Sequence, residues 1–502
     1  MLTVPSNRIT VLFISSLITV CASAQLKVLM PDVSVKPVYG EITPVCDCHA
    51  LTKVSFPNAR IESAVVNEQE GSCRVTVIVN HPPAKDSVKV WIGLPIKHWN
   101  GRFEGTGGGG FLGGAAFSLG YPMTQGFAVG ATNTGHDGGS GSFALDSNRQ
   151  LQWQLIRDNA YLGIHDMTLV GKALVQSFYG KPARYAYFVG GSTGGRQGLS
   201  EAQRYPDDYD GILSLCPATN WTRLLAADLW PQVVMHELND YLPTQKFIAF
   251  NKALLEAVDG KDGMVDSVIE DPIHLQFDPK VFVGMKMGNS LFTEADAEVI
   301  KRIWGGAKTI DGKFLWYGTT PGTNLIDLAG TKGDPPTGNP FGISSEWVRY
   351  FLLSNPGWKG VPLTHEEFQL LCEQSLEQYS EVFATDNPDL TRFRDHGGKL
   401  IIVHGLSDNL IAPQGSINYY ERVQGRMGGQ AETAKFALLF LFPGLDHGFN
   451  GYGAKPTNHF DVLIHWVEEG KVPDKINAEV RDKSNNLVRS RSFAPYMKPT
   501  GE

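Results

Sequence analysis

Apolar and polar residues alternate in the first part of the chain in a way that predicts strands. Between Ser72 and Pro95 the alternation appears first in CRVTVIVN and then in VKVWIGLP. Successive side chains of a strand point to opposite faces, so this period of two indicates strands with one buried face. Shorter apolar runs follow in RFEGTG, FAVGATNT, YAYFVG and GILSLCPA. We expect these runs to be strands as well.

Helical patterns separate the later strands. From Ala160 to Gln176 the apolar residues recur close to helical spacing, and a polar, helix-compatible segment, GLSEAQRYP, follows Ser192. Strands that alternate with helices in this way favour a mostly parallel sheet covered by helices on both faces.

The pattern changes after Asn220. Residues 222–396 carry scattered tryptophans, turns such as DPPTGNPFG and helical pieces such as TEADAEVIKRIW, and strand-like text returns only with KLIIVHGLSD and KFALLFLFPGLDHG. We therefore predict an α/β core formed by residues 25–221 and 397–502, interrupted by a lid domain at 222–396.

The N-terminus has the pattern of an export signal. Arg8 precedes an apolar stretch at residues 10–20, and the small residues 22–24 stand before Gln25. This pattern predicts a signal peptide at 1–24 and a secreted protein, or a periplasmic one if the source is bacterial. A buried strand is one alternative. A membrane anchor is the other, but it needs about 20 apolar residues, more than this stretch offers.

The net charge limits the kinds of ligand that the protein can bind, and the cysteine content bears on its disulfides. The 502 residues include 44 Lys and Arg against 52 Asp and Glu, a formal charge of −8, which disfavours a nucleic-acid partner and favours a small or neutral ligand. Loss of Cys21 with the signal leaves five cysteines, an odd number. One of Cys46 and Cys48 is placed to bridge to Cys73, with Cys48 preferred. Zinc is not expected, because no CxxC pair occurs. Nothing in the sequence indicates the oligomeric state.

A glycine-rich segment matches the pattern of a nucleophile elbow. Residues 190–194 read G-G-S-T-G, which fits G-x-S-x-G, and they lie between an expected strand and an expected helix. Such a turn strains the serine backbone and exposes its hydroxyl, so small neighbours are needed. A phosphate-binding loop requires Lys followed by Ser or Thr, whereas Arg196 and Gln197 stand here. A merely flexible loop remains the alternative.

A serine hydroxyl needs a base and an acid to become a nucleophile, and both follow in the expected order. Asp408 comes after the strand-like LIIVHG, and His447 comes after ALLFLF. Strand-end positions in the order serine, acid, histidine favour a catalytic triad of Ser192, Asp408 and His447 over an isolated turn aspartate and loop histidine. Other candidates, better suited to supporting roles, are Asp446, His404, Asp137 and His136.

The negative charge that forms during acyl transfer needs two N–H donors. Thr193 offers one at the start of a helix, where the helix dipole also favours an anion. The glycine run 107–110 offers the other, and we expect Gly107 to provide it. Alternatively, these glycines form only a flexible turn.

At this level of detail the chain resembles the tannase and feruloyl esterase family of α/β-hydrolases. The resemblance rests on FPNARIESAVV, WNGRFEGTGGGG, ATNTGHD, YFVGGSTGGRQGLSEAQRYPDDYDGIL, HGLSDNLIAPQGSINYY and FPGLDHGFNG, spread over most of the mature chain. It implies an α/β-hydrolase fold, the triad named above, and a lid that forms the substrate pocket. Members of the family, which include a mono(hydroxyethyl) terephthalate hydrolase, cleave esters of aromatic acids.

The chain departs from the family at two glycines. Family members typically join a cysteine before the nucleophile to one after the catalytic histidine, but Gly191 and Gly448 occupy these positions here. Since both ends are missing, we expect an active site without this disulfide, in which packing and Asp408 position His447.

The resemblance also implies a calcium loop of the form D-x-x-D-G-x-x-D-G-I in the lid, built from the oxygen ligands that calcium prefers. This chain has the shorter EAVDGKDGM. An acidic turn that faces solvent is the alternative. The implied ligands of a structural Ca²⁺ are Glu256, Asp259, Lys261, Asp262 and Met264.

Two further residues are candidates for substrate contact. Trp347 is placed to stack on an acyl ring or to pack within the lid, and His404 is placed near the pocket. We find no arginine placed for a free carboxylate, which disfavours terephthalate monoesters. The expected function is a secreted serine carboxylesterase that hydrolyses hydroxycinnamic or gallic-type esters through an acyl-enzyme, without a catalytic cofactor. Alternatives are an esterase for another secondary-metabolite ester or lactone, and a non-catalytic binding protein of the same fold.

Overall fold

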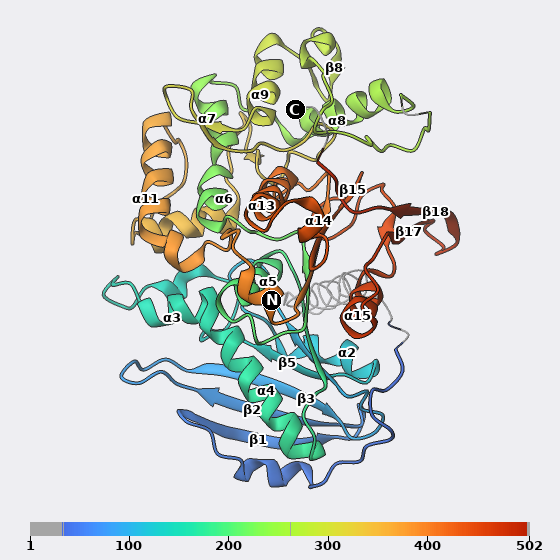
Figure 1. Cartoon of the computed structure of the whole chain (residues 1–502). Coiled ribbons are helices and arrows are strands. Elements are labelled where there is room, and N and C mark those ends of the chain that lie inside the picture. Colours follow the sequence, from blue (N-terminus) through green and yellow to red (C-terminus); the bar gives the residue numbers. More distant parts are fainter. Residues whose placement is uncertain (1–32, 34, 262, 499–502) are drawn as a thin grey trace, which may run out of the picture.

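The structure is a computed structural model that describes residues 33, 35–261 and 263–498. The predicted signal peptide, 1–24, lies outside the described residues. Figure 1 shows a large sheet in the lower and middle part of the molecule and a helical region above it.

The core is a nine-stranded sheet with the order β1-β2-β3-β5-β4-β6-β7-β14-β15. The six strands from β5 to β15 are parallel, whereas β1, β2 and β3 pair antiparallel with their neighbours. The nine strands are β1 (Ala59–Asn67), β2 (Ser72–Val79), β3 (Val88–Pro95), β4 (Arg102–Thr106), β5 (Ala128–Thr132), β6 (Tyr185–Gly191), β7 (Gly211–Leu215), β14 (Lys399–Gly405) and β15 (Ala437–Phe442). All of the strands expected from the sequence are present.

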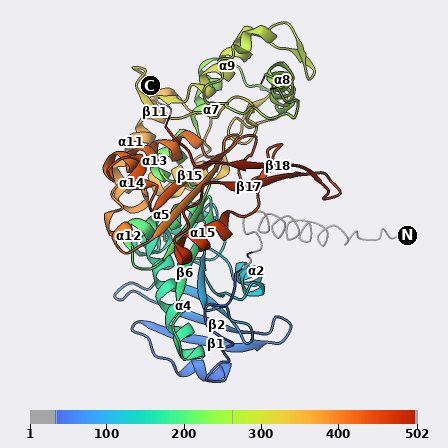
Figure 2. The same cartoon turned by 45° about the vertical axis from the view of Figure 1, so that its right-hand side comes forward.

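Helices cover both faces of the sheet, as predicted (Figure 2). On one face Phe188 of β6 and Ile212 of β7 belong to a core shared with Leu199 of α5. On the other face Tyr187 and Leu213, the neighbours of these residues, pack in the core that contains Phe460 of α15. The core helices are α2 (Gly120–Thr124), α3 (Trp153–Arg157), α4 (Gly163–Tyr179), α5 (Thr193–Arg204), α13 (Pro413–Arg426), α14 (Gln430–Thr433) and α15 (His459–Glu469), with the π-helical turn η4 (Asp158–Leu162) before α4 and the 3₁₀ turns η1 (Cys48–Lys53), η2 (Ala116–Leu119) and η3 (Gly141–Ala144).

Between β7 and β14 the described residues add no strand to the main sheet. Its helices are α6 (Trp221–Ala227), α7 (Trp230–Glu237), α8 (Thr244–Val258), α9 (Glu294–Trp304), α10 (Gly342–Glu346), α11 (His365–Phe383) and α12 (Thr391–Asp395), with η5 (Pro279–Phe282) and the π-helical turn η6 (Trp347–Leu352). Three two-stranded ribbons join them: β8 (Lys286–Met287) with β9 (Ser290–Leu291), β10 (Ala307–Lys308) with β11 (Phe314–Trp316), and β12 (Thr331–Lys332) with β13 (Thr337–Gly338).

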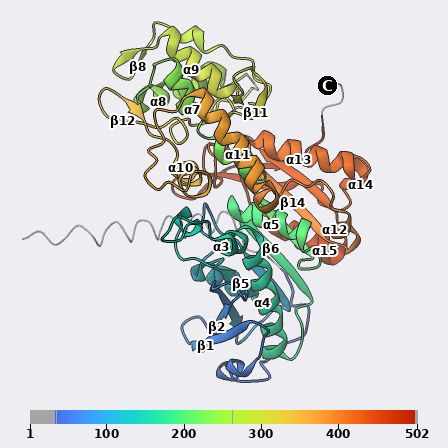
Figure 3. The same cartoon turned by 90° about the vertical axis from the view of Figure 1, so that its left-hand side faces the viewer.

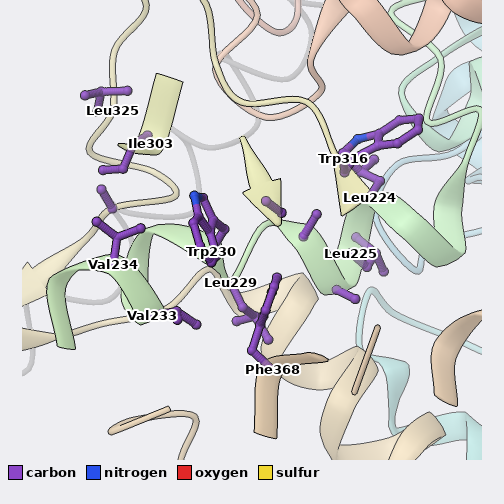
Figure 4. Close-up of a cluster of buried hydrophobic side chains, with 14 of the residues drawn as sticks. Leu224, Leu225, Leu229, Trp230, Val233, Val234, Ile303, Trp316, Leu325 and Phe368 are labelled. Atoms are coloured by element: carbon purple, nitrogen blue, oxygen red, sulfur yellow. The ribbon is translucent and has the colours of Figure 1, made fainter. Parts of the chain in front are cut away.

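Most of these lid helices share one hydrophobic cluster, which also includes Phe111, Ile156 and Ala160 of the α/β core. Figure 4 shows Trp230 of α7 near Phe368 of α11, with ring centroids 5.5 Å apart, and Leu224 of α6 beside Trp316 of β11. In Figure 3, α10 and α11 lie between the outer helices α7, α8 and α9 and the sheet. The lid region therefore stands over one edge of the sheet.

The disulfide between Cys48 and Cys73 is present, with the two Cα atoms 5.5 Å apart. It joins η1 to β2, which confirms the preferred pairing. Cys46, Cys216 and Cys372 are unpaired thiols. A smaller sheet near the C-terminus consists of β16 (Lys455–Pro456), β17 (Ile476–Arg481) and β18 (Leu487–Phe493), with α15 between β16 and β17 along the chain. Among the described residues, no helix is long and apolar enough to cross a membrane.

Candidate active site

Ser192 occupies a strained turn between β6 and α5. Its backbone has φ 60° and ψ −120°, a conformation that a side-chain-bearing residue seldom adopts. The glycine before the turn is required, because a Cβ at Gly190 would come within 2.6 Å of the Gly194 backbone. The segment therefore has the geometry of a nucleophile elbow, with Ser192 at the start of a helix.

Asp408 and His447 meet beyond the ends of β14 and β15. The Nδ1 atom of His447 lies 2.9 Å from Oδ2 of Asp408. Oδ1 of the fully buried Asp408 accepts the N–H groups of Leu410 and Ile411 at 2.9 and 2.8 Å. Burial opposes its ionisation, but the charge of the neighbouring His447 and the hydrogen bonds from His404 and His447 hold the pKa of Asp408 well below its usual range.

His447 is poised to take up a proton. Burial lowers its pKa, but the carboxylate of Asp408 outweighs this effect, and the result is a pKa well above the usual histidine value. Cys216, which ends β7 with a buried thiol, is the third member of this cluster: ligand atoms of Cys216, Asp408 and His447 lie within 4.8 Å of one another. Nothing in the sequence pattern singled out Cys216.

Asn409 positions the loop that carries His447. Its Oδ1 accepts the backbone N–H of His447 at 3.0 Å, and its Nδ2 donates to Asp327 of the lid region at 2.6 Å. The Asn409 side chain thus links the histidine loop to the loop after β14 and to the lid region. The disulfide typical of the family is absent here, because Gly191 and Gly448 occupy its two cysteine positions. The one feature of the sequence that points to Asn409 is its position directly after Asp408.

Ser192 and His447 border one small cavity. The other residues on its wall are mostly apolar, with two aromatic rings. They are Gly110, Thr193, Ala218, Trp221, Leu224, Leu225, Asp228, Phe341, Ile343, Leu410 and Ile411. The wall combines residues of the core with residues of the lid region, as the family resemblance implied.

The expected oxyanion donor Gly107 needs correction. Its N–H donates to the carbonyl of Val189 at 3.3 Å, and the residue borders a different cavity. Gly110 is the member of the run that lines the Ser192 cavity, and its carbonyl accepts the Thr193 hydroxyl at 2.7 Å. Gly107 packs against Gly194 of α5, where a Cβ would come within 2.5 Å of the Gly194 Cα atom, whereas Gly110 is the residue of the run on the wall beside Ser192.

Neither expected substrate contact reaches the cavity. Trp347 is fully buried in the lid core, where its indole N–H donates to Ser375 at 2.9 Å. His404 is also fully buried, and its Nε2 lies 3.2 Å from Asp408 while its Nδ1 lies 2.8 Å from Ser416. Trp347 is thus a residue of the lid core. His404 contacts the carboxylate of Asp408 inside the protein and is not on the cavity wall.

The described residues of the shortened loop do not fit a calcium site. Both oxygens of Asp259 accept backbone N–H groups, from Asp266 at 3.0 Å and from Ser267 at 2.9 Å. Glu256 is exposed and pairs with Lys252 at 3.7 Å. The family resemblance implies backbone carbonyls of Lys261 and Met264 as ligands, and Asp262 lies outside the described residues.

A largely parallel sheet with a serine at the elbow after β6, and an acid and a histidine after β14 and β15, defines an α/β-hydrolase. Residues 73–500 match the family model for tannase and feruloyl esterase, and the chain belongs to this family. It is accordingly a carboxylic ester hydrolase.

Individual relatives agree. The chain is 38% identical over 431 residues to a probable feruloyl esterase of Arthroderma benhamiae, which covers 83% of this chain and 80% of the relative. The crystal structure of an Aspergillus oryzae esterase superposes with a TM-score of 0.79 at 25% identity, covering 89% and 95% of the two chains. A tannin acyl hydrolase from Aspergillus niger has a TM-score of 0.79 at 26% identity, with coverage of 94% and 91%.

Proposed function

We propose that this chain hydrolyses esters of aromatic carboxylic acids, with Ser192 as the nucleophile. The observation that carries the proposal is the arrangement of three side chains. His447 lies 2.9 Å from the carboxylate of Asp408 and shares the wall of one cavity with Ser192.

In the proposed reaction His447 takes the proton of Ser192 while the hydroxyl oxygen attacks the ester carbonyl. Asp408 stabilises the imidazolium, and N–H groups of Thr193 and Gly110 hold the oxyanion. His447 then protonates the departing alcohol, which leaves an acyl group on Ser192. A water molecule, activated in the same way, releases the acid and restores the serine. No cofactor takes part.

The wall of the cavity supports an aromatic acyl group. Trp221 and Phe341 offer ring surfaces among aliphatic side chains, and relatives are named feruloyl esterase and tannin acyl hydrolase. Among the described residues on this wall there is no Lys or Arg. A free carboxylate on the acyl ring would therefore lack a counter-charge, so terephthalate monoesters are disfavoured.

The decisive experiment compares wild type with Ser192→Ala on methyl ferulate, methyl gallate and short p-nitrophenyl esters. Loss of the hydroxyl should reduce kcat by about 10⁶-fold, because the remaining groups have no nucleophile to activate. Labelling by a fluorophosphonate should likewise require Ser192. Substantial turnover by a folded Ser192→Ala protein, or no labelling of the wild type, would refute the proposal.

We further propose that residues 1–24 direct export. The Cys48–Cys73 disulfide supports this, since such bonds persist mainly in oxidising compartments. N-terminal sequencing of the exported protein should begin at Gln25, and a product that retains Met1 would contradict cleavage.

A further inference from the structure

A histidine outside the active site is surrounded by three carboxyl groups. His81 and Asp86 lie in the loop between β2 and β3. Asp158 is the first residue of η4, and Asp166 belongs to α4. Ligand atoms of His81, Asp86 and Asp158 lie within 4.8 Å of one another. The proposed ester hydrolysis uses none of these four side chains.

The distances around the imidazole suit a shared set of metal ligands. Nδ1 of His81 lies 2.7 Å from Oδ2 of Asp86 and 3.4 Å from Oδ1 of Asp158. Donor atoms about 2.1 Å from one cation are roughly 3.0–3.4 Å apart in octahedral or tetrahedral geometry. A small widening between His81 and Asp86 is therefore enough for the three atoms to bind one cation.

The other atoms of these side chains are held from outside the cluster. Nε2, the second ring nitrogen of His81, lies 3.1 Å from Oδ2 of Asp166. Metal-binding histidines usually donate their second N–H to a carboxylate, which fixes the tautomer and the orientation of the ring. Oδ1 of Asp86 accepts the backbone N–H of His81 at 2.9 Å, which leaves Oδ2 directed at the imidazole.

Asp158 is a fully buried acid with one unpartnered oxygen. Gln154 donates to Oδ1 at 2.8 Å, but Oδ2 has no hydrogen-bond partner among the described residues. Burial raises the pKa of Asp158 to about 7; the two other acids of the cluster add to this, whereas Gln154 and His81 oppose it. A buried carboxylate in this state is costly unless a cation neutralises it.

The cluster holds more negative charge than one imidazolium can balance. Among the ion pairs of the described residues, His81 is the only cationic group that pairs with Asp86, Asp158 or Asp166. A divalent cation bound to a neutral imidazole brings one more positive charge to the same place than a proton does. Replacing the proton by such a cation therefore improves the local charge balance.

We propose that His81, Asp86 and Asp158 bind one divalent transition-metal cation, with Asp166 orienting the imidazole. The cation takes the place of the proton on Nδ1, which passes to solvent, while Nε2 keeps its proton and donates to Asp166. One nitrogen and two carboxylate ligands suit Zn²⁺ or Mn²⁺ better than Ca²⁺, which prefers oxygen alone. The lack of a CxxC pair argues only against a cysteine-based zinc site.

A cation at this site would fasten the loop between β2 and β3 to η4. The same turn supports the helix behind the nucleophile, because the guanidinium group of Arg196 in α5 donates to the carbonyl of Ala160 at 2.9 Å. α5 begins directly after Ser192. A ligand that binds only the folded chain stabilises it, so we expect Zn²⁺ to raise Tm.

Calorimetric titration and thermal unfolding of chelator-treated protein test the site, with Zn²⁺, Mn²⁺ and Ca²⁺ as probes. The wild type should bind Zn²⁺ and Mn²⁺ more tightly than Ca²⁺, and its Tm should rise with Zn²⁺. His81→Ala and Asp86→Asn each remove a ligand, so each should raise the Kd for Zn²⁺ by about 100-fold or more and abolish the rise in Tm. Asp166→Asn keeps all three ligands and should raise Kd by about tenfold, because the imidazole loses its orienting carboxylate.

His274→Ala is the matched control, because the exposed imidazole of His274 pairs with a single acid, Asp271, at 2.8 Å. Its Kd for Zn²⁺ should equal that of the wild type. Ser192→Ala should also bind Zn²⁺ normally, so this site and the proposed hydrolysis fail independently.

Two results would overturn the inference: no saturable binding of Zn²⁺ or Mn²⁺ by the wild type, or an unchanged Kd in His81→Ala and Asp86→Asn. Circular dichroism of the metal-free variants shows whether they fold. If both ligand variants were unfolded, Asp166→Asn would decide, since an unchanged Kd in that variant also contradicts the site.

Discussion

At the scale of single residues, the reaction depends on the protonation state of His447. The raised pKa of His447 keeps the imidazole protonated to a higher pH than usual, and a protonated imidazole cannot accept the Ser192 proton. We therefore expect kcat/KM to be low in acid and to rise through that pKa. Asp408→Asn removes the charge that raises the pKa, so its acid limb should move to lower pH. Its plateau should fall by about 10³–10⁴-fold, because the imidazolium loses its partner.

The measurement is the pH dependence of kcat/KM for both proteins on one ester. Asp446→Asn is the control: Asp446 also lies beside His447, but its Oδ1 accepts a backbone N–H from Asn450 at 2.7 Å and it makes no hydrogen bond to the imidazole. An acid limb that stayed at the same pH in Asp408→Asn would show that another group governs it.

Active-site residues that follow strands are predictable from the sequence, whereas those whose places depend on the folding of loops are not. Ser192, Asp408 and His447 are predictable because each comes directly after a run of buried apolar residues. Gly110 and Asp228 are not, since their places depend on how loops fold over the sheet. Asp228 had one visible sign, a lone acid within the apolar text of LLAADLW.

At the scale of elements, the loop between β15 and α15 has to hold His447 without the disulfide typical of the family. Asn409 links it to the loop after β14 through the backbone N–H of His447 and reaches Asp327 of the lid region. Asn409→Ala should therefore lower kcat by about tenfold or more with a smaller change in KM, because small displacements of a catalytic base are costly.

Steady-state kinetics on methyl ferulate would check this expectation. Asn450→Ala serves as the control, because the hydrogen bonds that Asn450 makes within the histidine loop come from its backbone. A kcat for Asn409→Ala equal to that of Asn450→Ala would mean that packing alone positions the imidazole.

Some helices and strands are easier to predict from the sequence than others. Strands of the parallel part were recognisable because they are buried on both faces and therefore nearly all apolar. β1 was not expected, since in its sequence ARIESAVVN only Ala64 is fully buried, and Val65 and Val66 are exposed. Trp347 was ambiguous because an indole suits a binding wall and a core equally well, and only the packing of η6 against α11 decides for the core.

At the scale of the whole molecule, the disulfide and the active site lie far apart along the sheet. Cys73 is in β2, and the order β2-β3-β5-β4-β6 places three strands between it and the strand that leads to Ser192. The bond closes a loop with a sequence separation of 25, which restricts the unfolded chain. Replacing both cysteines, as Cys48→Ala with Cys73→Ala, should therefore lower the free energy of unfolding by about 3 kcal/mol while kcat/KM stays near that of the wild type.

Urea unfolding and ester hydrolysis, measured on the same preparation, separate the two effects, and Cys46→Ala provides a control because its thiol forms no disulfide. A large loss of kcat/KM with unchanged stability would mean that the antiparallel end of the sheet communicates with the nucleophile elbow, contrary to a stabilising role confined to η1 and β2.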